Sequence, residues 1–313
     1  MTLTATPAVG WSFAGFTGDV SGPSPATVTM DANKNVTATF TQNTNALAVS
    51  VVGSGTVTKV PDQATYTYGE VVTRTATPAV GWSFAGFTGD ATGGSPATVT
   101  MDGNKSVTAT FTQNTYTLAV TVVGSGTVAK APDQATYTYG ELVTLTATPT
   151  VGWSFAGFTG DATGGSPATA TMDANRSVTA TFTQNTYTLD VTVVGSGTVT
   201  KAPDQATYSY GEVVTLTATP AVGWSFVSFT GDATGPSPAT VTMDGNKSVT
   251  ATFAQNTYTL AVSVVGSGTV TKAPDQATYT YGEVVTLTAT PAVGWSFAGF
   301  TGDVTGPSPV PFL

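Results

Sequence analysis

The stretch Pro78-Ala79-Val80-Gly81-Trp82-Ser83-Phe84-Ala85-Gly86-Phe87-Thr88-Gly89-Asp90 decides how this chain is organised. It occurs five times, nearly letter for letter, and contains the only tryptophans of the sequence: Trp11, Trp82, Trp153, Trp224 and Trp295. Successive tryptophans lie 71 residues apart, with no insertion or deletion. A fixed period of this kind is the signature of a tandem-repeat protein.

The composition favours strands over helices. Hydrophobic residues make up 40% of the chain and charged residues only 9%, and Thr and Val are abundant. β-branched and aromatic residues that alternate with Thr favour strands, and the strong helix formers Leu, Glu, Lys, Arg and Gln are scarce. We therefore expect an all-β fold.

Several classes of function are disfavoured by the composition. The net charge is −9 with nine basic residues, so the chain has no basic patch for nucleic acid. It has no Cys and no His, which excludes disulfides, Cys/His zinc sites and Ser-His triads. No apolar run has the roughly 18–20 residues that span a bilayer, and no signal peptide is visible. We expect no enzyme, no cofactor and no membrane insertion.

The period divides the chain into units. Counted from the Thr that follows Gln-Asn, complete repeats span 44–114, 115–185 and 186–256. Residues 1–43 correspond to the C-terminal part of a repeat and 257–313 to the N-terminal part, so the sequence looks like a fragment of a longer protein. Each partial repeat should leave an unpaired strand edge, which invites strand swapping between identical neighbours.

Alternating patterns predict the strands of each repeat. In 115–185 the predicted strands span 115–123, 127–130, 135–139, 143–148, 153–158, 168–172 and 178–182. The turn Gly124-Ser125-Gly126 predicts a hairpin, and the last two strands read as a closing hairpin. Only Thr112 to Thr115 separate the core strands of adjacent repeats, which predicts units arranged end to end as an elongated rod.

One position conflicts with the predicted faces. Arg74 stands where the other copies have Leu3, Leu145, Leu216 and Leu287, on the face predicted to point inward. An unpaired buried Arg costs several kcal/mol. Either Arg74 extends its charged end to the edge of the core, or the face is assigned wrongly there.

The repeated motifs resemble a known family. In 115–185 these are Tyr139-Gly140-Glu141, Val143-Thr144-Leu145-Thr146-Ala147, Pro149, Gly152-Trp153-Ser154-Phe155-Ala156-Gly157-Phe158 and Val178-Thr179-Ala180-Thr181-Phe182. Together they resemble the divergent branch of the internalin-type B-repeat, a tandem domain of exported bacterial proteins. Phe158 and its equivalents stand where the family pattern has a final Trp. The resemblance implies a small β-grasp-like fold, an extracellular or cell-surface location, and no catalytic residue.

The aromatic residues of the repeated stretch are expected to be structural core anchors: Trp11, Trp82, Trp153, Trp224, Trp295, Phe84, Phe155 and Phe226. A platform on which sugars stack is the alternative for Trp153 and Phe155. The core is favoured, since a Gly-Trp-x-Phe strand is more often buried.

Acidic residues are the remaining candidates for a site. Asp90, Asp161 and Asp232 could each bind Ca²⁺ with loop carbonyls, but one Asp among neutral residues is more often a turn former. Asp133 and Glu141 as a glycosidase pair are disfavoured, and so are the Thr-x-Thr ladders as an ice-binding face, because small sheets twist.

Two functions remain for the sequence. The first is a non-enzymatic stalk or spacer of a bacterial surface or secreted protein, presenting an adhesive or catalytic domain. The alternative is a multivalent module that binds a glycan or a host or matrix protein through loops and aromatic edges. The expected partners are neighbouring repeats of the same chain.

Overall fold

The computed structural model describes residues 1–312, and every regular element in that range is a β-strand. The all-β fold expected from the sequence is thereby confirmed. Residues 1–43 hold β1 (Thr2–Leu3), β2 (Trp11–Gly18), β3 (Ala26–Thr27) and β4 (Val36–Gln42). Repeat 44–114 holds β5 (Thr44–Asn45), β6 (Leu47–Val52), β7 (Gly55–Val60), β8 (Tyr66–Thr67), β9 (Val71–Pro78), β10 (Trp82–Gly89), β11 (Ala97–Thr100) and β12 (Lys105–Gln113).

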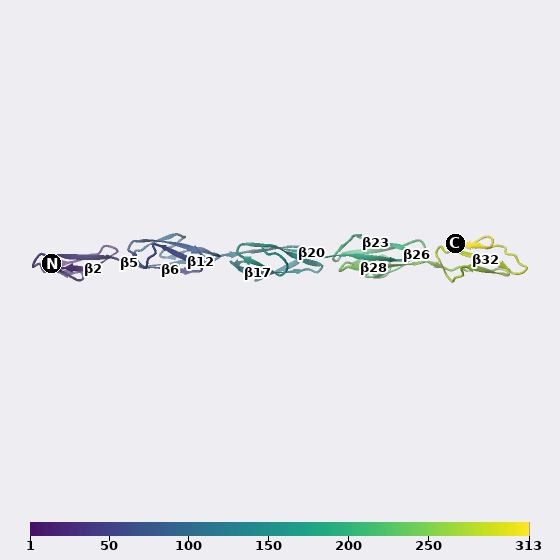
Figure 1. The fold of residues 1–313 in the computed structure, drawn as a ribbon, viewed down its shortest axis with the longest axis horizontal. Helices are drawn as coiled ribbons and strands as arrows, with labels where there is room; N and C mark the ends of the chain where they lie inside the picture. The colour runs from purple at the N-terminus through teal and green to yellow at the C-terminus, as the bar shows by residue number, and fades with distance from the viewer. Residues whose placement is uncertain (313) are drawn as a thin grey trace. The chain divides into compact units, whose positions relative to one another are not determined.

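The same strands recur down the chain (Figure 1). Repeat 115–185 holds β13 (Thr115–Tyr116), β14 (Leu118–Val123), β15 (Gly126–Ala131), β16 (Tyr137–Thr138), β17 (Glu141–Pro149), β18 (Trp153–Gly160), β19 (Ala168–Met172) and β20 (Arg176–Gln184). Repeat 186–256 holds β21 (Thr186–Tyr187), β22 (Leu189–Val194), β23 (Gly197–Ala202), β24 (Tyr208–Ser209), β25 (Val213–Pro220), β26 (Trp224–Gly231), β27 (Ala239–Thr242) and β28 (Lys247–Gln255). Residues 257–312 hold β29 (Thr257–Tyr258), β30 (Gly268–Ala273), β31 (Tyr279–Thr280), β32 (Val285–Pro291) and β33 (Val310–Phe312).

The chain separates into two compact units whose boundary runs through repeat 115–185. The first comprises Met1–Val123, Val128–Ala147 and Gly157–Thr181, and the second comprises Gly124–Thr127, Thr148–Ala156 and the residues from Phe182 onward. Repeat 44–114 lies wholly in the first unit and repeat 186–256 wholly in the second, so these two repeats show the fold most completely.

In the first unit, repeat 44–114 consists of two three-stranded sheets and a short ribbon. One sheet has the order β10-β12-β6, the other has the order β11-β9-β7, and β5 pairs with β8. β12 is the central strand of its sheet, antiparallel to β10 and parallel to β6. The parallel pairing requires a long connection, which the strands of the second sheet provide.

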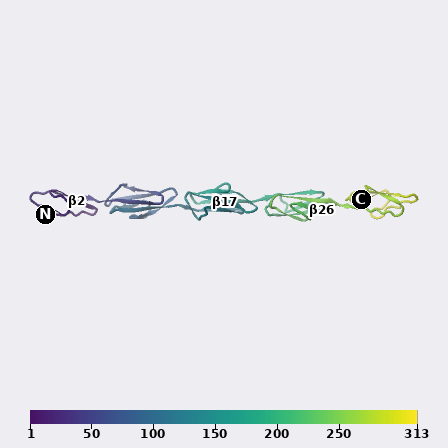
Figure 2. The same ribbon diagram turned by 90° about the horizontal axis from the view of Figure 1, so that it is seen from below.

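In the second unit, repeat 186–256 has the same arrangement, and Figure 1 labels β23, β26 and β28 from its two sheets. β28 is parallel to β22, with Leu189 opposite Lys247, and antiparallel to β26, with Trp224 opposite Gln255. The ladder with β26 has a β-bulge between Phe226 and Ser228. Figure 2 labels β2 and β26, which both carry the repeated tryptophan stretch.

Both hairpins predicted from the sequence are wrong, as the equivalent strands of repeat 44–114 show. β6 and β7, which flank Gly53 to Gly55, belong to different sheets, and so do β11 and β12. The glycine turn therefore carries the chain from one sheet to the other. The misreading arose because alternation identifies strands but not their partners, and the parallel partner of β12 lies about 58 residues earlier in the chain.

The core of each complete repeat lies between its two sheets. In 186–256 it contains Tyr208, Val214, Leu216, Phe229, Met243, Val249, Ala251 and Phe253, all nearly inaccessible to solvent. The most deeply buried aromatic ring of the tryptophan stretch is therefore its last Phe, Phe229, rather than Trp224, which packs at the margin.

Arg74 points inward, as its place in the strand pattern predicted. Its side chain is 0% exposed, so it does not extend to the edge of the core. None of its three guanidinium nitrogens has a hydrogen-bond partner, and its charged end lies 4.7 Å from the centre of the Phe87 ring. Burial lowers the pKa of Arg74. The predicted face is right, and the first of the two explanations for Arg74 is wrong.

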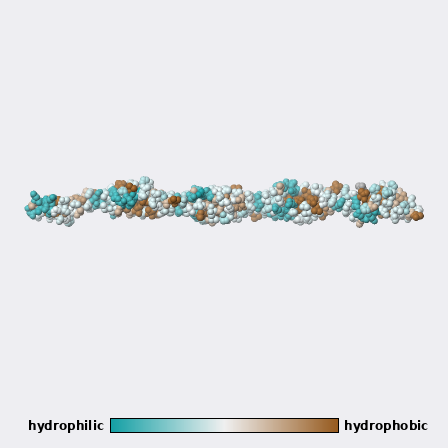
Figure 3. Space-filling model, in the orientation of Figure 1, coloured by the Kyte–Doolittle hydropathy of each residue, from teal (hydrophilic) through white to brown (hydrophobic). Residues whose placement is uncertain are grey.

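The first and last parts of the chain contain fewer sheets. Residues 1–43 form the two-stranded pairs β1-β3 and β2-β4, while 257–312 form the pair β29-β31 and the sheet β30-β32-β33. Apolar side chains are exposed in both parts, among them Trp11, Met30, Val265 and Trp295. Figure 3 shows apolar residues at the surface in scattered groups between polar ones.

Candidate functional site: the joint between repeats

One asparagine connects each repeat to the next. At the end of repeat 44–114, the Asn114 N–H donates to Gly81 O (2.8 Å) and the Tyr139 N–H donates to Asn114 O (3.0 Å). The Ser83 hydroxyl donates to Asn114 Oδ1 (2.6 Å). The N–H of Asn114 is thus bonded within its own repeat, whereas its C=O is bonded to Tyr139 of the next repeat, so that Asn114 bridges the two.

A glycine and a tyrosine complete the contact. Gly81 has a φ of +77°, which favours glycine, and a Cβ placed there would lie 2.3 Å from Cδ1 of Tyr139. The backbone of one repeat thus packs directly against the aromatic ring of the following repeat. We call this group of Gly81, Ser83, Asn114 and Tyr139 a joint.

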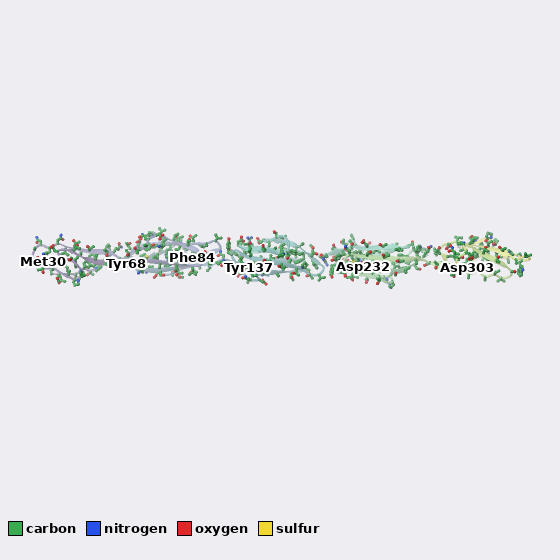
Figure 4. The ribbon with its side chains drawn as sticks, turned by 60° about the horizontal axis from the view of Figure 1, so that its bottom comes forward. Met30, Tyr68, Phe84, Tyr137, Asp232 and Asp303 are labelled. Atoms are coloured by element: carbon green, nitrogen blue, oxygen red, sulfur yellow. The ribbon has the colours of Figure 1, made fainter. Side chains whose placement is uncertain are left out.

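The joint occurs four times with the same bonds. The other three groups are Gly10, Ser12, Asn43 and Tyr68; Gly152, Ser154, Asn185 and Tyr210; and Gly223, Ser225, Asn256 and Tyr281. Their Asn N–H to Gly O distances are 2.8 to 2.9 Å. Figure 4 labels Tyr68, the tyrosine of the first joint.

Sequence reasoning missed the joint, although it recognised that the linker is short. The Asn of Gln-Asn-Thr served only to mark where a repeat begins, and the Gly before Trp served as a turn. The available signal was that Gly81, Asn114 and Tyr139 recur at the same period in every junction. Backbone hydrogen bonds leave no side-chain pattern, so the partners themselves could not be predicted.

The expected core anchors differ in burial. Trp82, Trp153 and Trp224 are half-buried, as are Phe84, Phe155 and Phe226. Trp11 and Trp295 are 42% and 58% exposed, so these two do not act as core anchors. The rings of Phe84 and Phe226 contact Phe111 and Phe253 at centroid distances of 5.4 Å each, which places them at the side of the core.

The three aspartates proposed as weak ligand candidates each bind the start of the strand that ends its repeat. Asp90, Asp161 and Asp232 accept hydrogen bonds through Oδ2 from the N–H groups of Ser106, Ser177 and Ser248, at 2.6 to 2.7 Å. The Ser177 N–H, together with Arg176, lowers the pKa of Asp161. In residues 1–312 no group of three or more acidic side chains is positioned to hold a metal ion.

Asp133 and Glu141 do not face each other across a shared site. Asp133 pairs with Lys130 Nζ (2.9 Å). Glu141 accepts from the Thr138 N–H (2.9 Å) and from Gln134 Nε2 (3.0 Å), so each carboxylate stabilises its own turn. No helix that could cross a bilayer is found in the described part of the chain.

Comparison with known proteins identifies the repeat. The family model described as the divergent InlB B-repeat domain matches residues 1–44, 45–115, 116–186, 187–257 and 258–310. No curated protein matches the chain.

Among solved structures, the chain is similar to "The Bacillus anthracis TIE protein", with a TM-score of 0.38 and 7% identity over 72% of this chain. It spans 54% of that protein's chain. The similarity at this level carries no argument, whereas the five family matches cover nearly every residue. The chain belongs to the divergent InlB B-repeat family.

Proposed function

We propose that this chain is a non-enzymatic spacer of a bacterial surface or secreted protein, and that its joints hold consecutive repeats at a fixed spacing. B-repeat domains occur in bacterial surface proteins and are typically non-catalytic. The observation that carries the proposal is the joint itself, which recurs four times with the same backbone bonds.

The joint limits bending for a physical reason. A flexible linker needs residues whose backbone groups are free to bond with water. The residue between β12 and β13 is Asn114, whose N–H, C=O and side-chain oxygen are all bonded within the protein. Rotation of one repeat against the next would break the bond from the Tyr139 N–H to Asn114 O and separate Gly81 from the Tyr139 ring, so each added repeat should add a constant length.

Deletion of whole repeats tests this proposal. We expect the maximum dimension from small-angle X-ray scattering to fall by the same increment when 115–185 or 186–256 is removed from the full chain. Deletion of both should double the decrease. A maximum dimension that does not fall in proportion to the deleted repeats would contradict the spacer function.

A second function is favoured by one recurring surface feature. The valine two residues before each tryptophan is strongly exposed in every copy: Val9, Val80, Val151, Val222 and Val293. A repeated apolar contact point is suited to binding by avidity. If the chain binds a glycan or matrix protein, replacement of all five valines by Ser should abolish binding and leave the scattering unchanged, whereas an effect on scattering alone would support the spacer.

A further inference from the structure

A short segment, which we call the Asn turn, leads into the last strand of each complete repeat. Its three copies are Asp102-Gly103-Asn104-Lys105-Ser106, Asp173-Ala174-Asn175-Arg176-Ser177 and Asp244-Gly245-Asn246-Lys247-Ser248. The copies differ only at the second and fourth residues, and the Asp, the Asn and the Ser are the same in all three. Asn, any residue except Pro, and then Ser or Thr is the acceptor motif for N-glycosylation. The variation therefore avoids both residues that the motif requires.

A fourth Asn turn departs from this sequence and still has the motif. In Asp31-Ala32-Asn33-Lys34-Asn35 an Asn replaces the serine, which removes the motif from Asn33. The same replacement creates the motif Asn35-Val36-Thr37 two residues later. The asparagines of the joints have Asn or Tyr at the second following position, which the motif does not allow: Asn43, Asn114, Asn185 and Asn256. The motif is thus present at all four Asn turns and at none of the joints.

The asparagine of each complete turn is exposed and is held through its oxygen. Oδ1 accepts from a backbone N–H near the start of the same repeat: Ala46 for Asn104 (2.8 Å), Thr117 for Asn175 (3.0 Å) and Thr188 for Asn246 (3.1 Å). Within residues 1–312, Nδ2 of these asparagines donates no hydrogen bond. The amide nitrogen, which is the atom that N-glycosylation modifies, is therefore the free end of the side chain.

The serine of each Asn turn serves the fold through its backbone and not through its hydroxyl group. The Ser106 N–H donates to Asp90 Oδ2 (2.6 Å), but every residue except Pro supplies a backbone N–H. In the part of the chain that the structure describes, the hydroxyl groups of Ser106, Ser177 and Ser248 form no hydrogen bond, and these side chains are exposed. The Oδ1 bond explains the Asn by itself. The motif also explains the hydroxyl two positions later.

The fold leaves room for a glycan on the amide nitrogen. A Cβ on Gly103 or Gly245, the residue before the Asn, would have no atom within 4 Å. A glycosylated Asn keeps its Oδ1 and one N–H, so the bond from the Ala46 N–H can form with the sugar in place. Ala46 follows the joint residue Asn43 by three positions, so the glycan would lie close to a joint along the chain. The modification is compatible with the folded repeat.

We propose that Asn104, Asn175 and Asn246 are acceptors for N-linked oligosaccharides, one on each complete repeat. The donor is an oligosaccharide attached to a polyprenyl lipid through pyrophosphate, and an oligosaccharyltransferase of the exporting cell catalyses the transfer. Nδ2 forms a bond to the anomeric carbon of the sugar while the bond from that carbon to the pyrophosphate oxygen breaks. The lipid pyrophosphate leaves with the electron pair, and Nδ2 loses one of its two protons. Each glycan adds a bulky, solubilising group at the surface.

The transfer takes place before the repeat folds. In the folded repeat the Asn104 Oδ1 is bonded to the Ala46 N–H and the Ser106 N–H is bonded to Asp90, so the Asn turn is held against the body of the repeat. A chain that is being exported is not yet folded, and its Asn turn is free to enter the active site of a transferase. The transferase must therefore be present during export.

Export of the full 313-residue chain in a glycosylating cell tests the proposal. The chain, behind a cleavable export signal, is produced in bacteria together with an oligosaccharyltransferase that accepts Asp-x-Asn-x-Ser and an undecaprenyl-pyrophosphate-linked oligosaccharide. We expect mass spectrometry to find the glycan on the peptides that contain Asn104, Asn175 and Asn246. Asn114, which is followed at the second position by Tyr116, should remain unmodified.

Two substitutions of one serine separate the motif from the fold. Ser106→Ala should remove the glycan from Asn104 although the asparagine is still present, whereas Ser106→Thr retains a hydroxyl group and should retain the glycan. The sites at Asn175 and Asn246 serve as internal standards in both variants. Neither variant should shift the unfolding midpoint of the unglycosylated chain, because both keep the N–H that donates to Asp90.

Three results would overturn the proposal. The first is any of the three peptides without glycan in cells that glycosylate a separate acceptor protein. The second is a glycan that remains on Asn104 in Ser106→Ala. The third is sugar attached to Ser or Thr side chains instead of the three asparagines. The proposal depends on export of the chain but not on its function as a spacer, because the result is read from peptide masses and not from the length of the chain.

Discussion

Repeats 44–114 and 186–256 have the same strands, sheet order and joints, yet one has a charge at the centre of its core. Arg74 of β9 occupies the place that Leu216 occupies in β25, and both side chains are 0% exposed. Leu216 belongs to the apolar core cluster of its repeat. Arg74 has three guanidinium nitrogens without a hydrogen-bond partner, and its charged end lies over the Phe87 ring.

The difference shows that the fold tolerates a large local penalty. An uncompensated buried charge costs several kcal/mol, which is comparable to the whole stability of a small domain. The neighbouring strands and the joints are unchanged in repeat 44–114. We therefore expect 44–114 to be the least stable of the three complete repeats, and the following predictions address that difference.

Exchange of the two residues should give the largest effect. Leu216→Arg should destabilise repeat 186–256 by about 3–5 kcal/mol, since it introduces an unpaired buried charge, and Arg74→Leu should stabilise 44–114 by about 1–4 kcal/mol. Differential scanning calorimetry of the full chain should show the lowest transition rising in the second variant and a new low transition in the first. Thr217→Arg, at an exposed neighbouring position, is the control and should change neither. If Arg74→Leu left every transition in place, the stability difference would be refuted.

The joints should respond alike in both repeats. Gly81→Ala and Gly223→Ala each place a Cβ 2.3 Å from the Tyr ring of the next repeat and impose a positive φ on Ala. The positive φ alone destabilises an Ala residue by about 1–2 kcal/mol. Guanidinium unfolding followed by tryptophan fluorescence should show similar losses of unfolding free energy in the two variants. Gly103→Ala should show no loss, because a Cβ at Gly103 has no atom within 4 Å. Unequal losses would mean that the repeats differ in more than residue 74.

A second sequence difference should have little effect. Repeat 186–256 has Ser228 where 44–114 has Gly86, and both stand at the same β-bulge. A Cβ on Gly86 would lie no closer than 3.5 Å to Gly93 O, and although Gly86 has a φ of +152°, Ser228 occupies the equivalent bulge without a positive φ. We expect Gly86→Ser to change the unfolding free energy of 44–114 by less than about 1 kcal/mol. A larger loss would show that the glycine of this bulge is required in that repeat.

Acid should leave the difference in stability between repeats 44–114 and 186–256 nearly unchanged. Lys105 and Lys247 lower the pKa values of Asp102 and Asp244 below the unfolded value of 3.8. A lowered carboxylate pKa stabilises the folded state above that unfolded value, and the contribution is lost as the pH falls through the folded pKa. Both repeats have the same pair, so calorimetry at neutral pH and in acid should shift their transitions together. If the difference between the two transition temperatures disappeared in acid, a group other than Arg74 would be its cause.

The sequence was sufficient for the repeat, the all-β fold and the inward face of Arg74, because all three follow from period and alternation. The sequence was insufficient to predict which strands pair with one another. The parallel partners β6 and β12 are far apart in sequence, and no local pattern connects them. It also predicted Trp11 and Trp295 as core anchors, whereas their side chains are 42% and 58% exposed. The aspartates were correctly placed after the tryptophan strand, but their N–H partners could not be predicted.

Each complete repeat carries both halves of the joint: the glycine, serine and asparagine at one end, and the tyrosine at the other. Any two copies are therefore already matched, whichever repeat precedes or follows. A whole repeat could therefore be added or removed, and the new boundary would still contain a complete joint. The length of the array could thus change within a lineage in single steps, without compensating mutations at the boundary.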